Sequence, residues 1–162
     1  LGYITVVLCS RLAGEAREAG RLWAAVALDQ RRLRLLAPAD GSGKPVCILS
    51  GGETTVSLRG SGQGGRNQEL ALAFLLELEE AGEQAEGIWF LSASTDGSDG
   101  PTDAAGAFAS REQVLEYRKL GLEPREYLAN NDSYNFFRTV GGLLATGPTK
   151  TNVCDIQICL VR

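Results

Sequence analysis

Polar side chains in three glycine-rich loops are the residues of this chain that could carry chemistry. Arg66 follows a pair of glycines and precedes an apolar, helix-like run, Asp96 follows the strand-like run Ile88–Ser92, and Thr149–Asn152 lie before a final strand-like run. Backbone amides and the dipole at a helix N-terminus favour an anion, and an arginine fork binds carboxylate or phosphate through two hydrogen bonds. These patterns indicate an enzyme that acts on a phosphorylated or carboxylated small molecule.

Arg66 has two interpretations that its position leaves open. In the first, Arg66 binds a substrate or phosphate anion together with Gly64, Gly65 and Asn67 around the start of the helix. In the second, it is a surface arginine that pairs with Glu69 or with a nearby aspartate. Asn67 is also suited to be the N-cap of this helix, because its short side chain can accept a hydrogen bond from an amide of the first turn.

Three aspartates, Asp96, Asp99 and Asp103, lie in one glycine-rich loop. Carboxylates held close together could bind Mg²⁺ or act as a base on a hydroxyl group. In the alternative interpretation, Asp99 and Asp103 are turn and cap residues. Asp96 is the stronger catalytic candidate, because substrates of α/β proteins bind where strands end. We expect Asp96 or Asp99 to be the magnesium ligand.

Two segments contain parts of nucleotide-binding motifs. Gly60, Gly62 and Gly65 satisfy G-x-G-x-x-G between a strand-like and a helix-like run, as in a dinucleotide fingerprint. The acidic residue that ends the next strand should follow about 20 residues on, but Asp96 lies 31 residues after Gly65, so NAD(P) binding fits poorly. Thr146–Asn152 (TGPTKTN) lacks the glycine directly before the lysine and precedes a strand, which excludes a P-loop.

The polar residues Thr149, Lys150, Thr151 and Asn152 can still bind an anion, because hydroxyl, ammonium and amide groups all donate hydrogen bonds. A second polar segment, Asn130–Ser133, precedes a helix-like run. We expect its residues to be helix-cap and turn residues, as these residue types commonly are.

The composition excludes several classes of protein. The sequence has no histidine, which excludes Ser-His-Asp and Cys-His catalysis and histidine metal sites within this chain. A net charge of −4 without a basic stripe argues against a nucleic-acid partner, and no apolar run reaches the roughly 18 residues of a membrane span. The four cysteines lie in or beside strand-like runs, so we expect reduced, buried thiols and an intracellular protein.

Apolar periodicity predicts a single α/β domain with a central sheet flanked by helices, because strand-like and helix-like runs alternate. Strand-like runs on both sides of Gly51-Gly52 favour a mixed sheet, and the turn-rich segment Pro38–Pro45 is the expected break. Ser110 with Gln113 forms a capping-box pattern. The predicted strands are Tyr3–Cys9, Val46–Ser50, Thr54–Leu58, Ile88–Ser92 and Asp155–Val161, and the predicted helices are Gly14–Leu36, Gln68–Glu80, Ser110–Leu120 and Ser133–Val140.

The first strand and the first helix have specific expected burial patterns. Tyr3–Cys9 is rich in β-branched residues and is expected to be a buried strand. The helix that follows carries Leu22, Val26 and Leu33 on one helical face, which should be the buried face. Its last residues, Leu33–Leu36, could instead form a short strand.

Five motifs in order, GGETTV, GGRNQELALA, STDGSDGPTDAAGA, NNDSYNFF and TGPTKTN, give the chain a family resemblance. Together they resemble the C-terminal domain of the class II glycerate kinases, known as the MOFRL domain, some of whose relatives carry a hydroxypyruvate reductase label. The resemblance is strong from Lys44 onwards. It implies a lead-in strand and helix over residues 1–45 and a MOFRL-type domain over residues 46–162.

The resemblance implies an ATP-dependent kinase that uses Mg²⁺ and phosphorylates D-glycerate in a cleft between this domain and a larger, N-terminal Rossmann-like domain. Arg66 of GGRNQE would hold the substrate or the transferring phosphate, and Asp96 of STDG would orient or deprotonate the glycerate hydroxyl. This chain alone would then be inactive. It differs from the bacterial pattern at Lys150 and Cys154, where the resemblance leads us to expect glycine and asparagine.

Two other functions remain open at this point. An NAD(P)-dependent hydroxypyruvate or glycerate oxidoreductase would use Gly60–Gly65 for its cofactor, and a non-catalytic module would use the same loops only to bind anions. The sequence leaves open which glycerate hydroxyl is phosphorylated, whether the compartment is the cytoplasm or the mitochondrion, and which oligomer forms.

Overall fold

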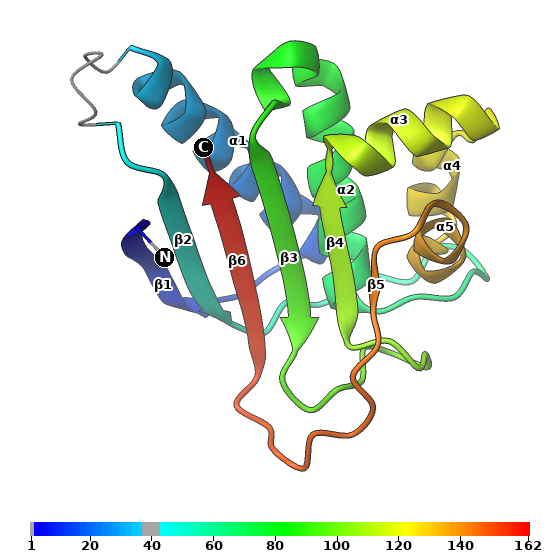
Figure 1. The fold of residues 1–162 in the computed structure, drawn as a ribbon. Coiled ribbons are helices and arrows are strands. Elements are labelled where there is room, and N and C mark those ends of the chain that lie inside the picture. Colours follow the sequence, from blue (N-terminus) through cyan, green and yellow to red (C-terminus); the bar gives the residue numbers. More distant parts are fainter. Residues whose placement is uncertain (1, 37–42) are drawn as a thin grey trace.

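The computed structural model describes residues 2–36 and 43–162, which form a six-stranded sheet with helices packed against it (Figure 1). The strands are β1 (Ile4–Leu12), β2 (Val46–Gly52), β3 (Ile88–Ser94), β4 (Gly106–Ser110), β5 (Leu143–Leu144) and β6 (Asp155–Val161). Their order in the sheet is β1-β2-β6-β3-β4-β5. β1 and β2 are parallel, and all other neighbours are antiparallel. The predicted α/β fold with a mixed sheet is confirmed.

Two long helices pack side by side behind the central strands and form the core with them (Figure 1). The helices are α1 (Ala16–Leu35), α2 (Arg66–Ala81), a 3-10 helix (Gly82–Ala85), α3 (Arg111–Leu120), α4 (Pro124–Ala129) and α5 (Ser133–Val140). α2 is buried almost all round, as its apolar run predicts. Its Phe74 stacks on Phe90 of β3 with ring centroids 4.2 Å apart, and Trp23 of α1 lies 5.3 Å from the same ring. These contacts hold α2, which begins at the site, against the sheet.

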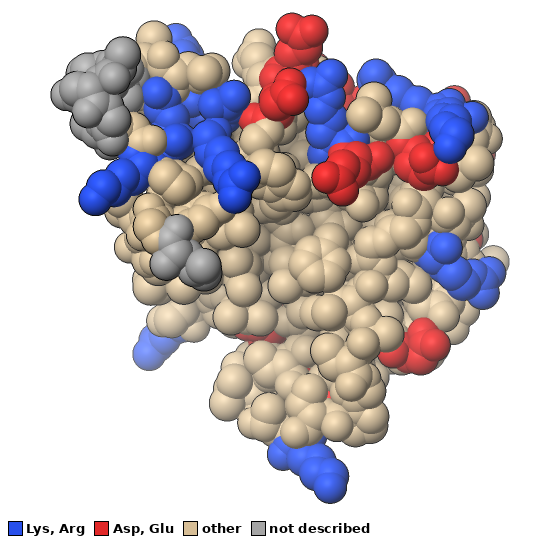
Figure 2. Space-filling view, viewed as in Figure 1, with Lys and Arg blue, Asp and Glu red and all other residues tan. Residues whose placement is uncertain are grey.

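The opposite face of the sheet is apolar and has no helix across it within the described residues (Figure 1). The strand register aligns Val7, Leu49, Ile158, Leu91 and Phe108 in one row. Figure 2 shows this face with mostly uncharged side chains at its centre and charged ones gathered towards its rim. The described chain is therefore a two-layer structure.

β1 lies at the edge of the sheet and is mostly exposed, whereas the sequence predicts a buried strand at Tyr3–Cys9. Val7, for example, is 67% exposed. The prediction of a strand is confirmed and the prediction of burial is wrong, because β-branched residues indicate an extended conformation but not the position of the strand in the sheet.

α1 buries a different face from the predicted one. Leu22 and Leu33 are 55% and 60% exposed. The cause is the close approach of α1 to α2, since a Cβ atom at Gly20 would lie 2.4 Å from the carbonyl oxygen of Leu70. The helix continues to Leu35, so the alternative of a strand at its end is wrong. Its buried residues are Ala16, Ala19, Gly20, Trp23, Ala24 and Ala27.

Several elements differ from the prediction. Thr54–Leu58 is not a strand, and Thr55 forms only an isolated bridge with Glu15. β4, β5, α4 and the 3-10 helix are additional elements. β4 consists mainly of small residues because it lies very close to β3, where a Cβ atom at Gly106 would lie 2.0 Å from the carbonyl oxygen of Ser92. Such a strand lacks the β-branched signal that identifies strands in sequence.

Several local predictions are confirmed. Ser110 and Gln113 form the capping box at the start of α3, and β3, β6 and α5 lie where the sequence places them. The predicted break at Pro38–Pro45 lies largely outside the described residues. None of the helices in residues 2–36 and 43–162 has both the length and the apolar character that a membrane span requires.

Candidate active site

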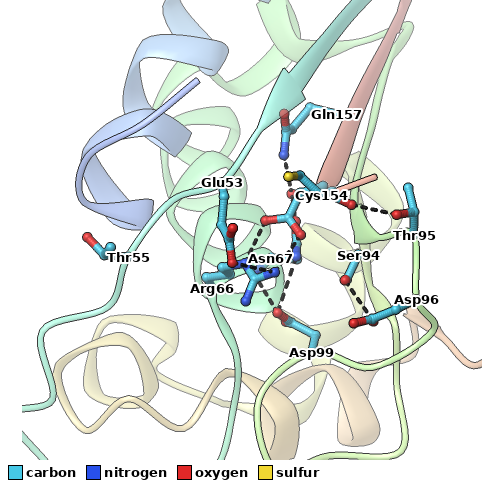
Figure 3. A network of polar contacts seen from close by, with 12 residues as sticks. Glu53, Thr55, Arg66, Asn67, Ser94, Thr95, Asp96, Asp99, Cys154 and Gln157 are labelled. Carbon is cyan, nitrogen blue, oxygen red and sulfur yellow. Dashed lines mark hydrogen bonds and ion pairs between the residues drawn. The ribbon is translucent and has the colours of Figure 1, made fainter. Parts of the chain in front are cut away.

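The first turn of α2 is capped by a buried carboxylate from the loop after β3 (Figure 3). Asp99 accepts hydrogen bonds from the backbone amides of Asn67 at 3.1 Å and Gln68 at 2.9 Å, and from the Asn67 side chain at 3.2 Å. Gly65 is the N-cap residue, not Asn67 as predicted. A carboxylate of the protein therefore occupies the anion position at Asn67 that the sequence assigned to a ligand.

Asp99 is fully buried, and this burial raises its pKa to about 6 although its hydrogen bonds from Asn67 and Gln68 lower it. Both of its oxygens accept bonds from the helix, so its contacts are those of a cap residue. Because both oxygens of Asp99 already accept hydrogen bonds from the helix, this geometry does not support the alternative in which Asp99 binds substrate or Mg²⁺. A Cβ atom at Gly65 would lie 2.3 Å from the Asp99 carboxyl carbon, which explains why glycine precedes α2.

A buried row of hydrogen bonds connects this cap to the sheet (Figure 3). Ser92 of β3 donates to the side-chain oxygen of Asn67 at 2.6 Å. Gln157 of β6 donates to the Ser92 hydroxyl at 3.3 Å and accepts from Ser50 of β2 at 2.7 Å. Three strands therefore fix the side chain that binds Asp99, and the first turn of α2 is tied to the sheet at the end where β3 leads into the loop.

The glycine-rich loop before α2 is bound along most of its length by the segment Asn130–Asp132. The amides of Arg59 and Gly60 donate to the Asn131 side chain at 2.7 and 3.0 Å. The next three amides donate to Asn130 and Asp132: Ser61 to the Asn130 side chain, Gly62 to the Asn130 carbonyl and Gln63 to the Asp132 side chain. The Asn130–Asp132 segment is thus more than the caps and turns that the sequence predicts.

These bonds change the meaning of the G-x-G-x-x-G pattern. A dinucleotide fingerprint needs free amides that face the pyrophosphate, and the amides from Arg59 to Gln63 are all used within the protein. Glycine is needed here because a Cβ atom at Gly60 or Gly62 would lie 2.3 or 2.4 Å from atoms of this segment. The amides of Gly64, which is half-buried, and of Gly65, which is buried, form no hydrogen bond within the described residues.

Arg66 forms a bidentate ion pair with Asp155, the first residue of β6 (Figure 3). Its Nε lies 2.6 Å from Asp155 Oδ2 and its Nη2 lies 2.8 Å from Oδ1. Nη2 also lies 3.2 Å from Glu53. The Asp155 side chain is fully buried, and the Arg66 side chain is 26% exposed. The remaining nitrogen, Nη1, forms no hydrogen bond within the described residues.

Arg66 thus forms an ion pair with an acidic residue, as the second interpretation predicts. The partner is Asp155, which lies 89 residues away in the sequence, and not Glu69. Glu69 instead accepts a hydrogen bond from Arg17 of α1 at 3.0 Å. The hydrogen bonds with Asp155 raise the pKa of Arg66 well above its usual value, so the guanidinium stays charged and its orientation is fixed.

Asp96 lies two residues beyond the end of β3 and is oriented by three donors. Its Oδ1 accepts from the Ser94 hydroxyl and the Ser98 amide, both at 2.9 Å, and its Oδ2 accepts from the Asn152 side chain at 3.3 Å. The Ser98 amide bond is the main cause that lowers the pKa of Asp96, with smaller contributions from Ser94 and from the charge of Arg66. Asp96 is therefore ionised at neutral pH.

The loop Thr146–Asn152 folds against the start of the aspartate loop and brings part of the predicted anion site to Asp96. Thr149 donates its amide to the Asp96 carbonyl at 3.1 Å and its hydroxyl to the Thr95 carbonyl at 2.5 Å. Lys150 and Thr151 are exposed. Thr149 and Asn152 thus support Asp96, while Lys150 lies on the surface at the tip of the loop.

The structure brings Arg66, at the start of α2, and Asp96, in the loop after β3, to the same end of the sheet (Figure 3). The described residues contain no group of three His, Cys, Asp or Glu side chains that could hold a metal ion. The arrangement can bind an anion at Arg66 and orient a hydroxyl group or a metal-bound phosphate at Asp96.

Sequence reasoning missed Asp155, Glu53 and Asn131 as residues of this region. A carboxylate that opens an otherwise apolar strand is the one local signal for Asp155, because burial of such a group requires a partner. Asn131 and Glu53 lie within motifs, but their local sequence does not identify their contacts.

Comparison with known proteins gives a consistent result. Residues 46–155 match the MOFRL family. The chain is 44% identical over 161 residues to the D-glycerate 2-kinase of Thermotoga maritima, and 45% identical over 162 residues to an Agrobacterium vitis protein that bears the name hydroxypyruvate reductase. Its fold is similar to the crystal structure of a glycerate kinase from Thermotoga maritima, with a TM-score of 0.87 and 42% identity.

These matches cover 99% of this chain but only 35% to 37% of the relatives. The chain therefore spans little more than a third of the length of the proteins to which it is similar.

The buried Asp99 predicts a distinctive dependence of stability on pH. Its pKa is raised to about 6 from an ordinary 3.8, so the folded chain binds a proton that the unfolded chain releases in this interval. The contribution of Asp99 to the free energy of unfolding therefore falls as the pH rises from 3.8 to 6. Chemical denaturation should show a larger fall for wild type than for Asp99→Asn across this interval. If the free energy of unfolding falls equally with pH in wild type and in Asp99→Asn, the raised pKa of Asp99 is contradicted. Asp103→Asn, at an exposed site in the same loop, is the control.

Proposed function

The chain belongs to the MOFRL family, and we propose that the protein containing it is a glycerate kinase that transfers a phosphoryl group from ATP to D-glycerate. The observation that carries this proposal is the 44% identity to a D-glycerate 2-kinase across 99% of the chain. The geometry supports it, because Arg66 and Asp96 lie together at one end of the sheet, each fixed by other groups. Phosphoryl transfer depends mainly on such positioning and on stabilisation of charge.

Arg66 is proposed to hold the carboxylate of glycerate or the transferring phosphoryl group. Asp155 fixes two nitrogens of its guanidinium, and Nη1 is left for the ligand. The free amides of Gly64 and Gly65 lie directly before it in the chain and can add donors to the same anion. Lys150 and Thr151, which are exposed on the loop that packs against Asp96, are proposed to contribute further donors to a phosphate. Both donors of Thr149 are already bonded within the protein, so its proposed role is to hold this loop in place.

Asp96 is proposed to orient the attacking hydroxyl of glycerate and to contact Mg²⁺. Its lowered pKa makes it a weak base, so orientation of the hydroxyl fits better than removal of its proton before the transfer. Because Mg²⁺ is usually bound by one or two carboxylates and by substrate phosphates, the single half-buried carboxylate of Asp96 fits this ion. Mg²⁺ bound there with ATP would neutralise the charge on the phosphate oxygens.

The remaining side of the active site is proposed to come from a larger, Rossmann-like domain that precedes this one. The proposal rests on the share of the relatives that this chain spans. We also propose an intracellular location, in the cytoplasm or the mitochondrion. Among the described residues all four cysteines are free thiols, which fits a reducing compartment.

The oxidoreductase alternative has one observation in its favour, the name of the Agrobacterium vitis relative. The geometry of the glycine-rich loop does not support it, because most amides that would cradle a dinucleotide are bonded to Asn130–Asp132. The anion-binding module has no feature that the kinase does not explain as well.

A coupled assay separates these functions. We expect a protein extended to the length of its relatives to consume MgATP only in the presence of D-glycerate, and the 162-residue chain alone to show no turnover. Hydroxypyruvate-dependent oxidation of NADH or NADPH without ATP consumption would favour the reductase, and binding of glycerate without either reaction would favour the binding module.

Arg66→Lys in the extended protein should lower turnover by roughly 10- to 100-fold, because lysine can keep the ion pair with Asp155 but cannot also present a second, fixed nitrogen. The free energy of unfolding should also fall, by about 1–3 kcal/mol, because a lysine cannot bind both oxygens of the buried Asp155 as the arginine fork does. Arg66→Ala should in addition destabilise the fold by about 3–5 kcal/mol, since it leaves the buried Asp155 unpaired. Arg118→Lys, at an exposed ion pair with Glu79, is the control. Wild-type kinetics for Arg66→Lys would remove Arg66 from the site.

Asp96→Asn should lower turnover strongly and lower the free energy of unfolding by only about 1 kcal/mol, because the amide oxygen can keep the bonds from Ser94 and Ser98 and only the bond from Asn152 is lost. The amide keeps one acceptor oxygen but loses the charge that attracts Mg²⁺. Asp103→Asn, an exposed carboxylate in the same loop that accepts a bond from Tyr134, should keep its turnover. Equal rates for wild type and Asp96→Asn would exclude the role proposed for Asp96.

A further inference from the structure

Asn131 is a buried residue with an unusual backbone conformation and a fully used side chain. It is 4% exposed and has a φ of 54°, in the left-handed region. Its oxygen accepts from the amides of Arg59 and Gly60, and its nitrogen donates to Glu69 at 2.8 Å and to the Ser57 carbonyl at 3.4 Å. Asparagine tolerates this φ better than most residues.

Glu69, the residue that Asn131 binds, lies in the first turn of α2, three residues after Arg66. It is 2% exposed and paired with Arg17 of α1 at 3.0 Å. Asn131 therefore connects the entry of the glycine-rich loop to the helix that follows it, with Arg66 between the two attachment points. The bonds of Asn131 hold the backbone before Arg66 at residues 59–60 and the side chain of Glu69 after it. They therefore restrict the position of the Arg66 Cα atom.

We propose that Asn131 is a positioning residue for phosphoryl transfer, which acts through the glycine-rich loop and Glu69 on the backbone of Arg66. The proposal rests on the proposed kinase function. Asparagine suits this place because it supplies an acceptor for two amides and a donor for a carboxylate. Asp155 fixes the guanidinium end of Arg66, and Asn131 fixes its backbone end.

Asn131→Gly is the first test in the extended protein, because glycine keeps the left-handed backbone while all four side-chain bonds are lost. We expect faster amide hydrogen exchange at residues 59–60 and a turnover roughly 10- to 100-fold lower, with a smaller change in the Michaelis constant for glycerate, as expected when a reacting group is displaced slightly. Thr139→Ala, on the exposed side of α5, is the control. Unchanged turnover, or lower turnover with unchanged exchange at residues 59–60, would overturn the proposal.

A donor–acceptor exchange is the second test. Asn131→Asp places a carboxylate against the buried Glu69, so we expect it to lose turnover at least as strongly as Asn131→Gly. Combining it with Glu69→Gln restores a donor opposite the new carboxylate at the same total charge. The double variant should recover at least 10-fold in turnover over Asn131→Asp alone, together with slow exchange at residues 59–60. Failure of this recovery in a double variant with wild-type thermal stability would overturn the proposal.

The two readouts also separate this proposal from the kinase function. If the wild-type extended protein has no glycerate kinase activity, the function fails while the exchange of residues 59–60 in Asn131→Gly still tests the attachment of the loop. If the wild type is active and Asn131→Gly is equally active, the positioning role fails alone.

Discussion

The carboxylate of Asp155 is fully buried at the start of β6, and the folded chain accommodates it because the fork of Arg66 binds both of its oxygens. A buried charge that loses its partner costs about 3–5 kcal/mol, so the fold depends on this pair. A second buried carboxylate, Asp99, is held by the first turn of the same helix. The start of α2 is therefore fixed by an ion pair with Asp155 and by the hydrogen bonds of its first turn to Asp99, and the proposed catalytic arginine is oriented by the ion pair. Stability and site geometry have the same cause here.

The polar groups behind these carboxylates extend the constraint into the sheet. Ser50, Gln157, Ser92 and Asn67 form a continuous buried hydrogen-bonded row that ends at Asp99. Buried polar groups are costly unless they are bonded, and a row of this kind specifies one alignment of β2, β6, β3 and α2. The apolar contacts around Phe90 stabilise the same layers but tolerate small shifts more easily. The polar row is thus what makes the site end of the sheet precise.

Local sequence patterns were sufficient for part of this structure. Alternating runs identified the α/β class, Ser110 and Gln113 identified the start of α3, and the apolar run of β3 placed Asp96 just beyond the end of a strand, because these features depend on neighbours within a few residues. The pair of Arg66 with Asp155 spans 89 residues and that of Arg17 with Glu69 spans 52, and no local pattern encodes such distances. The buried face of α1 was mispredicted for the same reason, since the close contact with α2 at Gly20 selects small residues over leucines.

The glycine-rich loop shows how a motif acquires its meaning from its surroundings. In a dinucleotide fingerprint, glycines permit a phosphate to approach the backbone. In this chain the glycines at positions 60 and 62 permit the segment Asn130–Asp132 to approach instead, and this segment takes up the amides that a phosphate would need. Only the amides of Gly64 and Gly65 are left, directly before Arg66. The protein therefore uses most of the loop amides to bind its own Asn130–Asp132 segment, and the anion site that we propose is limited to the part of the loop next to Arg66.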